Sequence, residues 1–275
     1  MPAVRFGTVV RLGRVVRLGR VFRLATVTGL IAQAALLGVL AGTVGLKPAG
    51  WLLGLAYGVA VNVTLGRGLA AGGEAGRLGP ANRITLTRAT LVGGVAALVG
   101  DGLIRPTSES ALGALVSLAT VALVLDAIDG RVARRTNTVT ALGARFDMEV
   151  DAFLIFVLSC YVAQSLGAWI LAIGLARYAS VAAGWVLPWL RRTPPARRWC
   201  KTVAAIQGIV LTVAAARVLP REWLIGALVV ALVLLSESFG RDIAWLWMHR
   251  PKAQRDRGRP KAQRDRVGAA LTFSE

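Results

Sequence analysis

Eight apolar segments, each close to the length of one bilayer crossing, constrain the fold of this chain most strongly. A helix needs about 20 apolar residues to cross the hydrocarbon core of a membrane. With 55% hydrophobic residues, the chain is also too apolar for an ordinary soluble domain. We therefore predict an all-α polytopic membrane protein with about eight spans. The segments are residues 25–46, 49–66, 84–104, 111–130, 146–165, 167–190, 202–219 and 222–240.

The basic residues are distributed unequally between the two ends of these segments. All but five of the 33 lysines and arginines fall on one side of the predicted membrane. The loops that remain in the cytoplasm carry the excess of Lys and Arg, so this side, with both termini, is predicted to be cytoplasmic. The bias of the composition towards Ala, Val, Arg and Gly suits a high-GC bacterium, so we expect a bacterial plasma membrane. The five exceptions are Lys47, Arg105, Arg177, Arg217 and Arg221.

The two ends of the chain differ from the rest in composition. Residues 1–24 carry arginines at a period of three, which forms no amphipathic face on an α-helix, so we interpret them as a basic tether to anionic lipid. Residues 250–275 contain a repeated, highly charged heptapeptide and are predicted to be disordered. This tail has no interleaved aromatic residues for base stacking, so we do not expect it to bind nucleic acid.

Four aspartates lie between two strongly apolar segments, where a carboxylate is costly to keep. Asp126 and Asp129 share one face if residues 111–134 form a helix, and Asp147 and Asp151 share a stripe of a second helix that begins near Gly143. Acids in this number call for hard divalent cations. Two Mg²⁺ ions, or Mn²⁺ in their place, would nearly balance four carboxylates and suit displacement at phosphorus.

The pattern Asp126-x2-Asp129-Gly130-x2-Ala133-Arg134-x8-Gly143-x3-Asp147-x3-Asp151 resembles the signature of the CDP-alcohol phosphotransferase family, with every fixed position present. The resemblance implies a six-helix catalytic membrane domain over about residues 80–245, usually as a homodimer. It also implies a metal-dependent enzyme of phospholipid biosynthesis, which transfers a phosphatidyl group from CDP-diacylglycerol, or a related CDP-linked lipid, to an alcohol and releases CMP.

The family pattern lacks a counterpart to residues 25–66, which we predict to form an extra N-terminal transmembrane hairpin. Three roles for the hairpin stay open: a dimer contact, a brace that faces lipid, or a lineage insertion. Its glycines permit close helix packing.

The resemblance also implies a role for each residue of the motif. The four aspartates would hold the metal ions, and Asp151 would in addition take the proton from the acceptor hydroxyl. Small residues in the motif would let the phosphates approach the backbone closely. The nucleotide-binding residues would be Asn82, Thr85, Gly130, Ala133, Arg134 and Gly143.

The acceptor is the least determined part of the prediction. Arg177 lies inside an apolar segment and needs a partner there, either the phosphate of an acceptor or an acid such as Glu237. Lys201-Thr202 is similar to a basic stretch of family members, although Gln207 lies farther along than the family pattern expects. With Arg177 and Lys201 as acceptor-binding residues, we expect a polyol or polyol phosphate, such as glycerol 3-phosphate or inositol phosphate.

A non-enzymatic transporter or scaffold with an acidic ion-binding pocket is the alternative. It would also explain apolar spans and buried charges. It would not explain small residues and an arginine at the spacings of the motif.

Overall fold

The computed structural model describes residues 27–71, 80–136, 141–191 and 198–249. For residues 66–71, 80–84, 129, 132–136, 141, 142, 191 and 198 it describes the backbone alone. The predicted tether 1–24 and tail 250–275 lie outside the described residues.

The described part of the chain is all-α, as the hydropathy predicts. Six of its helices are long and apolar enough to cross a membrane, which confirms a polytopic membrane protein; eight crossings stay a prediction. The described helices are an N-terminal helix (Val27–Val44), α2 (Pro48–Ala71), α3 (Pro80–Gly102), α4 (Glu109–Thr136), α5 (Ala141–Leu166), α6 (Leu171–Val186), α7 (Arg198–Ala216) and α8 (Arg221–Met248), with short 3₁₀ helices at Ala168–Ile170 and Pro188–Arg191.

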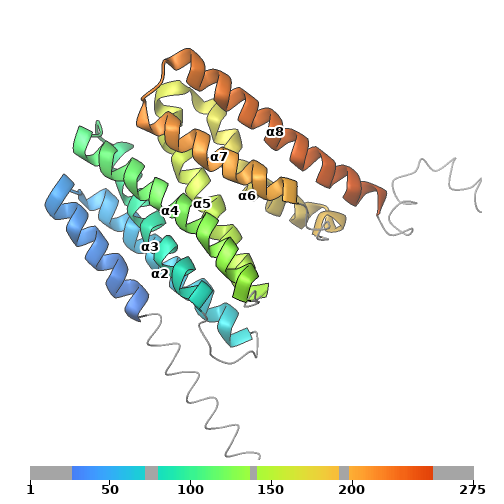
Figure 1. Cartoon of the computed structure of the whole chain (residues 1–275), viewed down its shortest axis with the longest axis horizontal. Helices are drawn as coiled ribbons and strands as arrows, with labels where there is room; N and C mark the ends of the chain where they lie inside the picture. Colours follow the sequence, from blue (N-terminus) through green and yellow to red (C-terminus); the bar gives the residue numbers. More distant parts are fainter. Residues whose placement is uncertain (1–26, 72–79, 137–140, 192–197, 250–275) are drawn as a thin grey trace, which may run out of the picture.

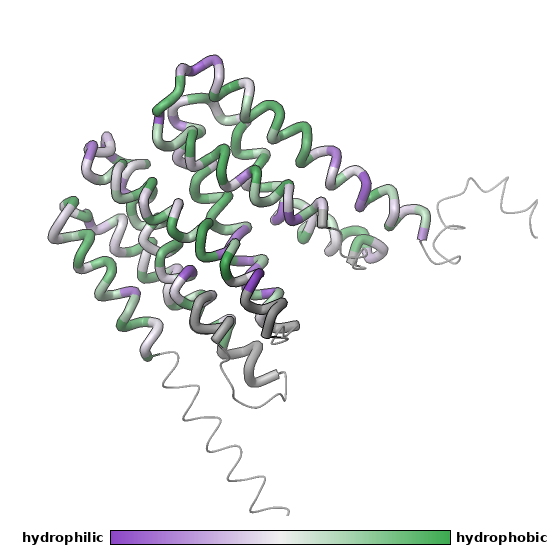
Figure 2. Tube along the Cα trace, viewed as in Figure 1, coloured by the Kyte–Doolittle hydropathy of each residue, from purple (hydrophilic) through white to green (hydrophobic). Residues whose placement is uncertain are grey.

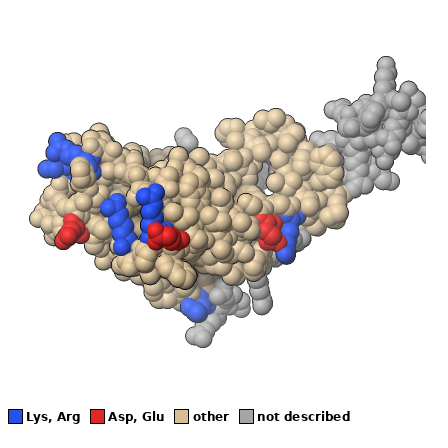
Figure 3. Space-filling view, turned by 90° about the horizontal axis from the view of Figure 1, so that it is seen from above, with Lys and Arg blue, Asp and Glu red and all other residues tan. Residues whose placement is uncertain are grey.

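Helices α3 and α5 lie in the middle of the bundle (Figure 1). Helix α3 packs against α2, α4 and α5, while α5 also packs against α6 and α7. The N-terminal helix and α8 lie at opposite edges. Apolar residues run along most of each helix (Figure 2), and on the face drawn in Figure 3 charged side chains occupy only a few clusters. Because α3 and α5 are surrounded by protein, they can carry charged residues away from lipid.

The N-terminal helix and α2 pack closely against α3 because glycines leave room for larger side chains. A Cβ atom on Gly54 would lie 2.7 Å from Leu37, and one on Gly93 would lie 2.5 Å from the amide of Gln33. At the other end of the hairpin, the Asp101 carboxylate of α3 accepts hydrogen bonds from the backbone N–H groups of Lys47 (2.6 Å) and Gly50 (2.8 Å). The predicted hairpin therefore contacts α3 at several positions along its length.

Several helix ends differ from the apolar segments that predicted them. The sixth segment, 167–190, is interrupted because Leu187 takes an extended conformation before Pro188. Gly167, with φ of 114°, separates α5 from the first 3₁₀ helix. Helix α8 continues well beyond residue 240 to Met248, and its Arg241 pairs with Glu237 one turn earlier.

Candidate active site

Three carboxylates from two helices meet at one place in the bundle. Asp126 lies in the second half of α4, and Asp147 and Asp151 lie one turn apart near the start of α5. One oxygen from each acid can be chosen so that all three lie within 4.8 Å of one another. The side chains are 37%, 36% and 32% exposed, so they are partly sheltered but accessible. Among the described residues, these three acids lie close together and a ligand can still reach them.

A buried arginine completes the cluster. Arg88 of α3 is only 1% exposed, and its Nη1 lies 2.6 Å from Oδ1 of Asp126. Its Nη2 contacts Oδ1 of Asp147 and lies 3.1 Å from Oδ1 of Asp151. The same Nη2 donates to the backbone carbonyl of Asp147 at 3.3 Å. One guanidinium thus joins α3, α4 and α5 at the acidic cluster.

The donor set fits a divalent cation. Three carboxylates against one guanidinium leave an excess of negative charge, and carboxylate oxygens are the ligands that Mg²⁺ and Mn²⁺ prefer. The acids would repel one another strongly if nothing offset their charge. Chemically, the site is suited to hold a cation beside a phosphate-bearing ligand.

Residues 79–236, more than half of the chain, match the CDP-alcohol phosphatidyltransferase family. The chain belongs to this family. No curated protein and no solved structure matched the chain. The matched region begins at α3 and ends within α8, so it contains the carboxylate cluster and excludes the N-terminal hairpin. CDP-alcohol phosphatidyltransferases transfer substituted phosphate groups in lipid synthesis, which agrees with an acidic site in a membrane bundle.

The other predicted family residues are described to different extents. Thr85 is buried on α3, one turn before Arg88, and Gly130 and Gly143 are partly exposed. Asp129 follows Asp126 by one turn of α4. The side chains of Asp129 and of three predicted nucleotide-binding residues lie outside the described part of the structure. These three are Asn82, Ala133 and Arg134.

The two predicted acceptor-binding residues lie on α6 and α7. Lys201 is exposed near the start of α7 and interacts electrostatically with Asp151. Arg177 of α6 pairs with Glu149 of α5 at 2.5 Å. The alternative that Arg177 pairs with an acid is confirmed, but the acid is not Glu237. Glu237 instead contacts Arg241 and accepts a hydrogen bond from Trp199 on α7. Gln207 is buried and donates to the Ala231 carbonyl, so it joins α7 to α8.

Sequence reasoning missed one residue of this site, Arg88, and one residue near it, Tyr57. Arg88 carried a usable signal, because an arginine inside an apolar segment requires an anionic partner. Tyr57 of α2 carried no such signal. Its ring stacks on that of Phe153 of α5, with 4.4 Å between the ring centroids, and it interacts electrostatically with Arg88 and Asp151. The N-terminal hairpin therefore reaches the neighbourhood of the acidic cluster.

Proposed function

We propose that this protein transfers a phosphatidyl group from CDP-diacylglycerol, or a related CDP-linked lipid, to an alcohol acceptor and releases CMP in phospholipid biosynthesis. The observation that carries the proposal is the convergence of Asp126, Asp147 and Asp151 within a family core. We also infer a homodimer in a bacterial plasma membrane, with the site and both termini on the cytoplasmic side. The concentration of basic residues on one side of the predicted membrane supports this orientation.

The proposed mechanism assigns a role to each described acid. Asp126, Asp147 and Asp151, together with Asp129, would hold two divalent cations, Mg²⁺ or Mn²⁺. When bound, the cations would neutralise the diphosphate and acidify the acceptor hydroxyl. Asp151 would take the proton from that hydroxyl, and the resulting alkoxide would attack the phosphorus of the phosphatidyl group. The bond from this phosphorus to CMP breaks, and CMP leaves.

The remaining predicted residues would hold the nucleotide and the acceptor. Thr85, Gly130 and Gly143, with Asn82, Ala133 and Arg134, would line the nucleotide pocket, where glycines let phosphates approach the backbone. Arg134 would offset diphosphate charge. Lys201 would face the acceptor, which its electrostatic interaction with Asp151 supports. Arg177 would exchange Glu149 for the acceptor's anionic group.

An acceptor panel tests the proposed function. Membranes that contain the protein are incubated with labelled CDP-diacylglycerol and glycerol 3-phosphate, inositol phosphate, inositol or serine, and the lipid products are separated by head group. We expect CMP release with a polyol phosphate and at least about tenfold less with the neutral inositol, because an anionic acceptor gains charge-assisted hydrogen bonds. No CMP release with any acceptor would contradict the proposal and favour a transporter or scaffold.

A further inference from the structure

Arg88 engages the acids that would have to hold a divalent cation. Its Nη1 contacts one oxygen of Asp126, and its Nη2 contacts one oxygen each of Asp147 and Asp151. The Arg88 side chain is only 1% exposed. We propose that Arg88 is a positioning residue that holds these carboxylates together in the metal-free protein and competes with a divalent cation for them. This inference rests on the proposed function, since it requires the site to bind such a cation.

Burial and charge together make this competition unavoidable. An arginine stays protonated in proteins, so its charge cannot be removed by loss of a proton. A buried guanidinium also cannot leave its acids without a replacement partner. A divalent cation bound to the same acids would lie close to this positive charge and be repelled by it. The wild-type cation affinity would therefore be weaker than the carboxylates alone would produce.

The same contacts give Arg88 an organising role before the cation binds. Three carboxylates within 4.8 Å of one another repel, and the guanidinium is the described cation that contacts all of them. The fork of an arginine reaches several oxygens at fixed angles, whereas a lysine ammonium is a compact point charge. Arg88 therefore joins α3, α4 and α5 in a geometry close to the one that a cation needs.

Direct Mn²⁺ binding tests the proposal without turnover. Mn²⁺ is titrated into the purified full-length wild type and into the Arg88→Gln and Arg88→Lys variants, and free Mn²⁺ is followed by electron paramagnetic resonance. We expect Arg88→Gln to bind Mn²⁺ about tenfold more tightly, because one positive charge is removed from the site. Arg88→Lys keeps the positive charge, so its Mn²⁺ affinity should stay within about threefold of the wild-type affinity. In EDTA, Arg88→Gln should unfold several degrees lower than the wild type, and saturating Mn²⁺ should remove most of that difference.

Arg145→Gln is the matched control, because Arg145 is an exposed cation of α5 two residues before Asp147. It should change Mn²⁺ affinity less than threefold. Equal or weaker Mn²⁺ binding by folded Arg88→Gln would overturn the competition. If that variant does not fold, Arg88→Met decides, because it also removes the positive charge, and Mn²⁺ binding no tighter than wild type overturns the inference. If neither the wild type nor the Arg88 variants bind Mn²⁺, the metal part of the proposed function fails as well.

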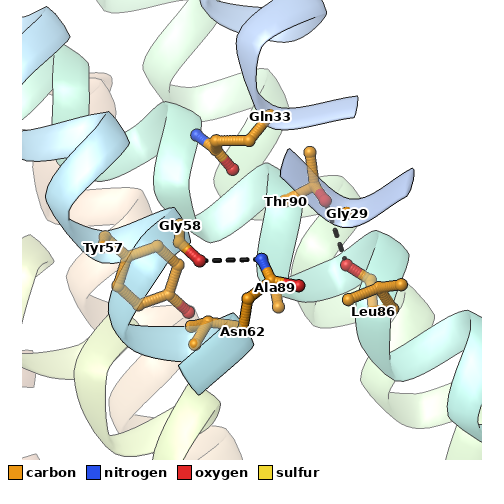
Figure 4. Close-up of a pocket in the computed structure, with 9 residues that line it drawn as sticks. Gly29, Gln33, Tyr57, Gly58, Asn62, Leu86, Ala89 and Thr90 are labelled. Atoms are coloured by element: carbon orange, nitrogen blue, oxygen red, sulfur yellow. Dashed lines mark hydrogen bonds between the residues drawn. The ribbon is translucent and has the colours of Figure 1, made fainter. Parts of the chain in front are cut away.

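A second inference concerns a small cavity between the N-terminal helix, α2 and α3 (Figure 4). Its volume is about 10 Å³, which is room for about one water molecule. Gln33 and Asn62 line it and are 2% and 3% exposed. Three buried polar atoms of its lining residues have no hydrogen-bond partner among the described residues: Gln33 Nε2, Asn62 Oδ1 and the Tyr57 hydroxyl.

We infer that this cavity binds one ordered water, which links the N-terminal hairpin to the helix that carries Arg88. Each of these atoms suits a water: Gln33 Nε2 and the Tyr57 hydroxyl can donate to it, and Asn62 Oδ1 can accept one of its hydrogens. Leu86 and Ala89 of α3 line the same cavity on either side of Arg88 in the sequence. The hairpin would then act as a support for the acidic site.

The Gln33→Leu variant distinguishes a bridging water from polar atoms that are truly unpaired. If the water is present, the variant leaves it without one of its donors, and Tm should fall by about 3 °C or more. If the atoms are unpaired, an apolar side chain should leave Tm unchanged or raise it, which would overturn the inference. Thr43→Val is the control, because Thr43 is exposed and bonds only within its own helix among the described contacts. A high-resolution structure should show a water within about 3.2 Å of at least two of these three atoms.

Discussion

Replacing Asp151 by asparagine is expected to lower the rate of CMP release by about 10³-fold or more. The amide cannot take the proton of the acceptor hydroxyl, and it is a weaker ligand for a divalent cation than a carboxylate. Both losses act on the same step, because the hydroxyl must be acidified and deprotonated together. The measurement is CMP release from CDP-diacylglycerol by purified protein at saturating acceptor.

The control for this variant is Glu109→Gln, which removes an exposed carboxylate from the first turn of α4, far along that helix from Asp126. Glu109→Gln should leave the rate of CMP release within about twofold of the wild-type rate. Thermal unfolding of both variants checks that any loss of rate does not come from loss of fold. A wild-type rate for folded Asp151→Asn would mean that another group takes the proton.

Chelation of divalent cations is expected to abolish the activity, with a loss of at least about 10³-fold that added Mg²⁺ or Mn²⁺ reverses. The acids Asp126, Asp147 and Asp151 would keep their places around Arg88 without the cation, so the fold should survive the treatment. The measurement is CMP release after dialysis against EDTA, followed by titration with each cation.

Recovery separates loss of the cation from damage to the protein. Chelated protein should keep its helical circular dichroism spectrum and regain at least most of its rate on addition of Mg²⁺. Activity that survives exhaustive chelation would contradict a metal-dependent mechanism, even though the family assignment would stand.

Much of the fold was predictable because a membrane helix must satisfy its own backbone and present an apolar surface. All eight apolar segments overlap helices of the described structure. Helix ends were less predictable. Pro188 interrupts an apolar segment through its backbone. Helix α8 continues to Met248 past the charged pair Arg241 and Asp242, which lies just beyond the predicted end of the segment.

The candidate site was predictable where its geometry is local to one helix. Asp147 and Asp151 lie one turn apart on α5, so spacing alone places them on one stripe. The contacts between helices were not predictable in this way. Arg88 lies 38 residues before Asp126 and 59 before Asp147, and Arg177 pairs with Glu149 rather than Glu237. Such pairs depend on how helices rotate and tilt against one another.

By itself, the sequence determined the order of the helices, the membrane environment and the position of each acid on its helix. These properties follow from periodicity and hydropathy within single segments. Only the tertiary structure decided that Arg88 lies among the carboxylates and that the N-terminal hairpin packs against the helix that carries Arg88. The physical reason is that ion pairs form over a few ångströms between residues far apart in the chain, and helix packing alone brings them within that range.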